Sequence, residues 1–203
     1  LILTGFILNA SAQDNAIVNK IRFTGIDTLQ KEILLTQMNT KARPFTGKLT
    51  FWKKTTRFSS FTFDEDLLQL KKYYQKNGFL DVSITSDLLP DKRNKKLDIL
   101  IHIRKGTPIS IGEINYSLTG TEANMPILES VKMILPLKTG NLFQDEKIIA
   151  SENLIREKFN HEGFPFVKVK KSIHLNEKLH AANINFNVNP GNKSYFGEIN
   201  LEG

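Results

Sequence analysis

The sequence has 203 residues, a formal net charge of +7 and no cysteine. This length accommodates one or two domains, and the lack of cysteine excludes disulfide bonds, thiolate metal sites and lipid attachment through a cysteine. The net charge excludes little, because we expect the chain to be a fragment of a longer protein whose remaining charges are not in view.

An apolar segment opens the chain. Residues 1–8 are almost wholly apolar, and Ala10 and Ala12 follow with the small-x-small spacing of a signal peptidase site. The segment is shorter than the ~20 residues that a transmembrane helix needs, which leaves a signal peptide or a buried N-terminal strand. We expect residues 1–12 to be part of a signal peptide and the mature, exported chain to begin near Gln13.

A strand and a helix come next. Apolar residues at alternate positions predict a strand over residues 17–23, which ends at Gly25. Asp27 then suits a helix N-cap, and the apolar spacing predicts a helix over residues 28–38. Residues 39–63 carry a proline, a glycine and no clear period. We therefore expect an elaborated loop there.

The acidic residues 64–66 place negative charge where a helix dipole favours it, and they predict the start of a second helix. This helix should end near Lys76, with Gly78 as a left-handed C-cap. Strands over residues 80–86 and 97–104 then form a hairpin whose turn contains Pro90. In the second strand, alternate apolar residues should face the core: Leu97, Ile99, Ile101 and Ile103.

The same pattern recurs at an interval of 85 residues. Gly78-Phe79 returns as Gly163-Phe164, and Gly106 returns as Gly191. Apolar positions coincide at the same interval, in the pairs Leu70 and Ile155, Tyr74 and Phe159, Val82 and Val167, Ile99 and Ile184, Ile101 and Phe186, and Ile103 and Val188. Each copy exceeds the ~20 to 50 residues of a solenoid repeat, so each can hold its own core.

The second copy predicts the same elements. Its helices should run from an Asn124 cap to about Leu135 and over residues 145–160, and its hairpin strands should start at Phe166 and Ala182. Each copy is thus an α+β domain of order β-α-α-β-β, in which two helices cover one face of a small three-stranded sheet. The predicted ranges are 13–106 for domain 1, 107–191 for domain 2, and 192–203 for the first strand of a truncated third domain.

This order of elements resembles the POTRA domain over nearly the whole mature chain. The residues that carry the resemblance are the glycine–phenylalanine junctions at Gly78 and Gly163, the final strands that close on Gly106 and Gly191, and the Gly-Glu-Ile opening at Gly112. POTRA arrays precede a membrane β-barrel in the BamA/TamA family of outer-membrane assembly factors, the bacterial surface antigens.

The resemblance implies a protein of the bacterial outer membrane, with this array of domains in the periplasm. Such an array would bind unfolded outer-membrane proteins, periplasmic chaperones or accessory lipoproteins, and would pass its clients to a C-terminal β-barrel. No barrel strands are present in this sequence, so the resemblance assigns no insertase activity to it. The alternative is a structural spacer that positions partner proteins without binding clients.

Strand addition is the binding mode that the resemblance implies. A client strand can bond to the main chain of an open sheet edge without any requirement on its own sequence, and the second strand is the usual edge of this fold. The candidate client-binding residues are Leu80, Val82, Ser83, Ile84, Thr85, Phe166, Val167, Lys168, Val169 and Lys170. In the loop of residues 39–63, Trp52, Lys53 and Lys54 are candidates for contact with a membrane surface or a partner, against a plain solvated loop.

Catalysis and cofactor binding find little support in the sequence. None of the four histidines has metal-ligand spacing with carboxylates, and an exported hydrolase would need a convergent polar site that the pattern does not provide. The basic stretches around Lys92 and Lys168 could indicate nucleic-acid binding, but export argues against it. We predict that the chain is not an enzyme and needs no cofactor or metal.

Overall fold

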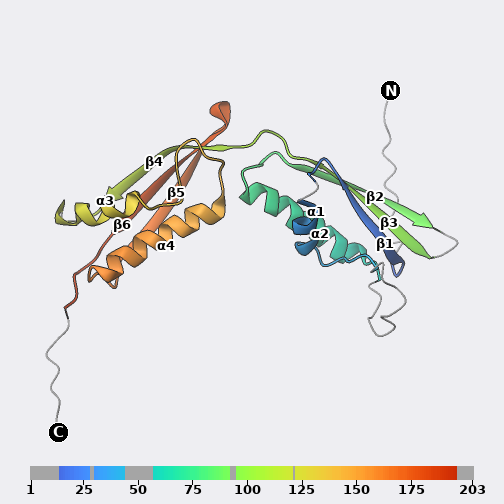
Figure 1. The fold of residues 1–203 in the computed structure, drawn as a ribbon, viewed down its shortest axis with the longest axis horizontal. Helices are drawn as coiled ribbons and strands as arrows, with labels where there is room; N and C mark the ends of the chain where they lie inside the picture. The colour runs from blue at the N-terminus through green and yellow to red at the C-terminus, as the bar shows by residue number, and fades with distance from the viewer. Residues whose placement is uncertain (1–13, 28–29, 44–56, 92–94, 121, 196–203) are drawn as a thin grey trace, which may run out of the picture. The chain divides into compact units, whose positions relative to one another are not determined.

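The computed structural model describes residues 14–27, 30–43, 57–91, 95–120 and 122–195 (Figure 1). The chain divides into two compact units, Leu1–Gln75 with Phe79–Gly106, and Lys76–Gly78 with Thr107–Gly203. Each unit contains a three-stranded sheet and helices, which confirms the predicted α+β fold class.

The first sheet has the strand order β1-β3-β2. Strand β1 (Ile17–Thr24) pairs in parallel with β3 (Lys96–Arg104), and β2 (Ser83–Asp91) pairs with β3 antiparallel. The last strand of the unit is therefore central. The first strand of the hairpin, β2, lies at one edge of the sheet.

The second sheet repeats this arrangement in the order β4-β6-β5. Strand β4 (Ser110–Leu118) is parallel to the central β6 (Ala181–Asn189), and β5 (Lys168–Asn176) pairs with β6 antiparallel. The predicted repeat is thus a repeat of topology as well as of sequence.

The helices lie on one face of each sheet (Figure 1). They are α1 (Gln30–Thr36) and α2 (Ser60–Lys76) in the first unit, and α3 (Met125–Lys132) and α4 (Asp145–His161) in the second. Short 3-10 turns, η2 (Glu122–Asn124) and η3 (Glu177–Leu179), precede α3 and β6. We call the face of each sheet that the helices cover the helix face, and the opposite face the open face.

The core of each unit forms between the helix face and the helices. All six pairs of apolar residues that coincide at the interval of 85 residues are buried, including Leu70 with Ile155 and Tyr74 with Phe159. On the central strands, the alternate apolar residues predicted to face the core are buried: Leu97, Ile99, Ile101, Ile103, Ala182, Ile184, Phe186 and Val188. Strict alternation therefore predicted the core correctly.

The glycine–phenylalanine junctions end the long helices. Gly78 has φ +85° and Gly163 has φ +91°, so the two predicted left-handed caps are confirmed. After the first, the backbone N–H of Phe79 donates to the carbonyl of Tyr74 at 3.0 Å. This hydrogen bond ends the helix and brings Phe79 back toward it.

The predicted start of the second helix is wrong. Helix α2 begins at Ser60, where the N–H donates to Oδ1 of Asp14 at 2.7 Å, so the acidic residues 64–66 lie inside the helix rather than in its first turn. Asp66 is fully buried and accepts hydrogen bonds from the backbone N–H groups of Asn39 at 2.6 Å and Thr40 at 2.8 Å. Its carboxylate anchors the chain that follows α1, a role that the dipole argument missed.

The predicted starts of the edge strands are also wrong. A turn precedes each strand, closed by Val82 N–H to the Phe79 carbonyl at 3.4 Å and by Val167 N–H to the Phe164 carbonyl at 3.2 Å. The strands therefore start later than expected, at Ser83 and Lys168, and the first strand ends later than residue 86, at Asp91. In the first hairpin, Pro90 belongs to β2 rather than to the turn, which is acceptable because β2 is an edge strand.

Two shorter helices differ at their ends from the prediction. Helix α1 covers Gln30–Thr36 rather than residues 28–38, of which 28 and 29 lie outside the described residues. Helix α3 ends at Lys132 rather than near Leu135, and Asn124 occupies its N-cap without a side-chain cap hydrogen bond. The 3-10 turn that precedes α3 gives Asn124 a helical backbone, in which its side chain does not cap.

The Gly-Glu-Ile opening lies within β4 and forms a bulge. The register of β4 against β6 shifts between Ile111 and Ile114, and the Glu113 N–H donates to Oδ1 of Asn183 at 2.9 Å. In β1 the register shifts at the matching place, where Nδ2 of Asn19 donates to Oδ1 of Asp98 at 2.6 Å. The motif therefore has a structural role inside the sheet.

Several predictions fall on residues outside those described. They are the signal peptide at 1–12, the candidate contact residues Trp52, Lys53 and Lys54, and most of the third-domain strand at 192–203. Within the described ranges, the helices are too short or too polar to cross a membrane.

Candidate functional site

The edges of the two sheets are the candidate site, because edge strands offer unpaired backbone groups. Alternate residues of an edge strand direct N–H and C=O groups away from the sheet, where they are available to another strand. Each sheet has two edges, β1 and β2 in the first unit and β4 and β5 in the second. The two edges of a sheet differ in how far the protein's own loops already cover them.

The beginning of β1 is covered. The N–H of Asn15 donates to the Phe58 carbonyl at 2.9 Å, and the Phe58 N–H donates to the Ala16 carbonyl at 2.8 Å. The N–H of Arg43 donates to the Val18 carbonyl at 2.9 Å. The bulge follows at once, so only residues 20–24 of β1 remain as a regular edge.

The beginning of β4 is covered in the same way. The N–H of Ile111 donates to the Asn141 carbonyl at 2.7 Å, and the Gly140 N–H donates to the Ile111 carbonyl at 2.8 Å. An isolated bridge joins Ser110 to Leu142. After the bulge, only residues 114–118 remain regular.

The other two edges are open along their length. Among the residues that the structure describes, no backbone hydrogen bond from a loop reaches β5 or residues 83–90 of β2. Both strands pair with their central neighbour over nine consecutive positions without a register shift. The edges β2 and β5 are therefore the long, regular edges to which an extended segment could add.

The side chains of β5 alternate between the two faces of the sheet. On the helix face, Val169 is buried and Ile173 is half-buried. On the open face, the exposed side chains are Lys168, Lys170, Ser172, His174 and Asn176. In the register with β6, Lys168 lies opposite Asn189 and Lys170 lies opposite Asn187.

The open face of the first sheet is different, because several of its polar and charged side chains contact one another across the strands. Nδ1 of His102 on β3 lies 2.9 Å from Oγ1 of Thr24 on β1, and its Nε2 lies 2.9 Å from Oδ2 of Asp87 on β2. Arg22 reaches Asp98 at 3.4 Å. These contacts link all three strands on a solvent-exposed face.

On the helix face of the second unit, Lys171 ties β5 to α4. Its Nζ lies 2.9 Å from Oε2 of Glu152, and Arg156 lies 2.6 Å from Oε1 of the same carboxylate. Partial burial alone would raise the pKa of Glu152, but the hydrogen bonds from Lys171 and Arg156 outweigh it and lower the pKa below its usual value. Lys171 is thus engaged within the domain, unlike Lys168 and Lys170.

The structure separates the predicted site residues into three groups. Six of them lie on the edge strands β2 and β5: Ser83, Ile84, Thr85, Lys168, Val169 and Lys170. Leu80 and Phe166 lie in the turns before the strands, where Phe166 is 72% exposed. Val82 and Val167 are buried core residues that precede the two strands.

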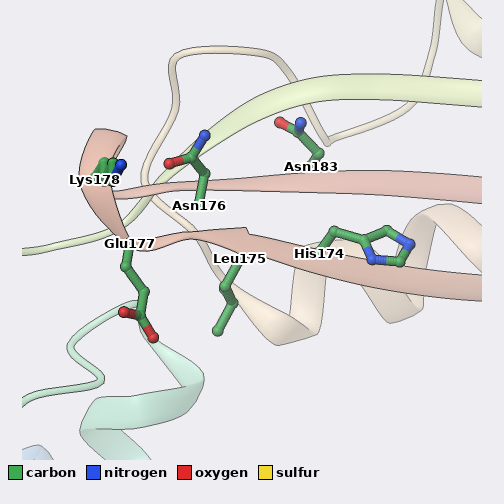
Figure 2. A pocket seen from close by; sticks show the side chains of 6 residues that line it. All are labelled: His174, Leu175, Asn176, Glu177, Lys178 and Asn183. Atoms are coloured by element: carbon green, nitrogen blue, oxygen red, sulfur yellow. The ribbon is translucent and has the colours of Figure 1, made fainter.

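An open hollow of about 510 Å³ lies at the end of the second hairpin. Figure 2 shows that Asn176 and Asn183 point to one side of the hairpin, whereas Leu175 and Glu177 point to the other. The polar groups therefore do not converge on one point. In the described part of the chain, no group of three or more histidine or acidic side chains is placed to hold a metal ion.

A solved structure with a similar fold is POTRA3-5 of BamA from Haemophilus influenzae, which is 20% identical, with a TM-score of 0.49, over 88% of this chain and 67% of that chain. Another is POTRA1-2 of the periplasmic domain of Omp85 from Anabaena, which is 6% identical, with a TM-score of 0.46, over 89% of this chain and 98% of that chain.

A curated relative is the outer membrane protein assembly factor BamA of Neisseria meningitidis serogroup B, which is 23% identical over 190 residues. The alignment covers 93% of this chain, whereas this chain spans only 23% of that protein's length. The family model of POTRA, the surface antigen variable number repeat, matches residues 16–106 and 111–191. The chain therefore belongs to the POTRA family, with one POTRA domain in each of the two matched ranges.

Proposed function

We propose that this chain is the periplasmic part of an outer-membrane protein assembly factor. It binds unfolded outer-membrane proteins, here called clients, by strand addition to β2 and β5, and passes them to a C-terminal β-barrel in the full-length protein. The observation that carries the proposal is the contrast between edges: β2 and β5 are regular and open, whereas loops and bulges interrupt β1 and β4.

Physical chemistry favours this mode for a receptor of many clients. Main-chain hydrogen bonds to an edge strand supply affinity without reading the client's sequence. Unfolded barrel proteins consist of segments with alternating hydrophobicity, which match an edge that has one apolar and one polar face. The relative named for outer membrane protein assembly supports this class of client.

The experiment uses the absence of native cysteine. Single-cysteine variants at Thr85 on β2 and Ser172 on β5 carry a photoactivatable crosslinker, and Ser117→Cys on β4 serves as the matched control, because all three side chains are exposed on open faces. We expect an unfolded outer-membrane protein to crosslink at 85 and 172 and only weakly at 117.

Equal crosslinking at all three positions would contradict the edge assignment. No crosslinking at any position, with the chain folded, would contradict client binding by this region. The spacer role, in which the domains only set the positions of partner proteins, would then account better for the chain.

A further inference from the structure

We propose that the β5 edge prefers client segments that carry acidic residues at alternate positions, whereas the β2 edge has no such preference. The inference rests on the proposed function, strand addition, and it concerns which strands are selected. It follows from the two lysines on the open face of β5, Lys168 and Lys170, and from the absence of lysine and arginine on β2.

The two lysines are exposed and lie two positions apart on one face of the edge strand. Neither has an ion-pair or hydrogen-bond partner in the described part of the chain. Their neighbours on the central strand are the uncharged Asn187 and Asn189. Each lysine is therefore available to pair with an acidic side chain on a strand that adds to the β5 edge.

Several other charged side chains on or beside the strands have partners. Lys171, on the helix face of the same strand, pairs with Glu152. On the open face of the first sheet, Asp87 contacts His102 and Asp98 contacts Arg22. Of the two open edges in the described part of the chain, β5 therefore carries unpaired lysines on its open face, whereas β2 carries no lysine or arginine.

An added strand would continue the alternation of β5. Residues of that strand on the open face would lie beside Lys168 and Lys170, and residues on the helix face would lie beside Val169 and Ile173. Opposite charges on neighbouring strands stabilise their pairing, and like charges destabilise it. The preferred segment therefore alternates apolar residues with aspartate or glutamate.

A different physical role for the lysines makes the opposite prediction. Lysines on an edge strand can prevent unwanted pairing because a strand that buries them loses their hydration. In that case, removal of the charge would increase binding of every strand. The two roles are distinguished by how binding depends on the charge of the peptide.

The experiment measures binding of extended peptides to the whole chain by NMR, with the β5 and β2 amides read separately. Three peptides share alternating apolar residues and differ at the intervening positions, which are glutamate, glutamine or lysine. At low ionic strength we expect the glutamate peptide to bind β5 about fivefold more tightly than the glutamine peptide, with no such difference at β2.

The double variant Lys168→Glu, Lys170→Glu should reverse this order, so that the lysine peptide binds β5 most tightly. The matched control Lys138→Glu, Lys178→Glu changes the net charge equally at exposed positions outside β5 and should leave the order unchanged. A glutamate peptide with N-methylated alternate amides keeps its charges but loses strand hydrogen bonds, and it should not bind.

Each outcome separates the two claims. Binding at β5 with equal affinity for all three peptides would overturn the charge preference and leave strand addition intact. Tighter binding of all peptides to the variant would establish lysines that block pairing, and binding of the N-methylated peptide would establish attraction without strand addition; either overturns the inference. No binding by any peptide would overturn the proposed function together with it.

Discussion

The rings of Tyr74 and Phe79 meet edge to face, with their centroids 6.0 Å apart, across the left-handed Gly78. Phe159 and Phe164 repeat this contact, also at 6.0 Å. The repeated glycine–phenylalanine motif is thus a helix stop that is closed by an aromatic pair. Its two copies differ by one hydroxyl group, which the first domain carries and the second lacks.

That hydroxyl predicts a stabilising substitution. The Tyr74 hydroxyl is buried with no hydrogen-bond partner in the described structure, and burial, with smaller effects from Tyr73 and Asp27, raises the pKa of Tyr74 to about 12. Tyr74→Phe should raise the free energy of unfolding of the first domain by about 1 kcal/mol, because an unsatisfied polar group is removed. Urea denaturation, followed by the amide signals of that domain, measures the change.

The reciprocal substitution, Phe159→Tyr, is the control for this argument. It buries a new hydroxyl in the second domain and should lower its stability by about 1 kcal/mol or more. A loss of stability in Tyr74→Phe would show that the hydroxyl makes a stabilising contact.

Among single substitutions of polar side chains, we expect that of Asp66 to reduce stability the most. Its buried carboxylate accepts the N–H groups of Asn39 and Thr40, so Asp66→Ala leaves one buried and one partly buried backbone donor without partners. We expect the first domain to lose about 2 to 4 kcal/mol of stability, measured by urea denaturation. Asp64→Ala, an exposed position in the same helix, should change it by less than about 0.5 kcal/mol.

The bulge in β4 predicts that the effects on stability of substitutions at Gly112 and Asn183 are not additive. A Cβ at Gly112 would lie 2.2 Å from Oδ1 of Asn183, the atom that accepts the Glu113 N–H. Gly112→Ala and Asn183→Ala should each destabilise the second domain by about 1 to 2 kcal/mol, through loss of the same hydrogen bond. The double variant should therefore cost less than the sum of the two, by about 0.5 kcal/mol or more. Additive costs would mean that the two residues act independently.

Glu152 predicts a dependence of stability on pH. The pKa of Glu152 is lowered in the folded protein. Its carboxylate therefore stabilises the fold at pH values above the pKa that Glu152 has in the unfolded chain. This contribution is lost as the pH falls through the pKa that Glu152 has in the folded protein. Glu152→Gln should destabilise the second domain by about 0.5 to 1 kcal/mol at pH 7, and the difference should vanish in acid. Glu157→Gln, an exposed change in the same helix, should show no comparable pH-dependent difference in a series of urea denaturations.

Much of the fold could be predicted because it depends on local patterns. Alternation identified the central strands, and Gly78 and Gly163 identified the helix ends, since a left-handed backbone at a helix end favours glycine. The repeat then showed that each copy forms its own domain. These features needed no knowledge of contacts between distant residues.

The errors lie where contacts between distant residues decide. Asp66 looked like a helix-start residue, but it binds the backbone of a segment 26 and 27 positions earlier. The turns before β2 and β5 contain apolar residues, so Val82 and Val167 looked like strand residues although they fill the core. The covering of β1 and β4 by loops likewise arises from pairing that has no local signature in the sequence.

The most direct measurement is amide hydrogen exchange of the whole chain, with and without a bound unfolded outer-membrane protein. Strand addition requires new hydrogen bonds to outward N–H groups, so exchange should slow at alternate residues of β2 and β5 and stay unchanged along β1 and β4. Bound client with no slowing on β2 or β5, or with protection confined to other surfaces, would contradict the account.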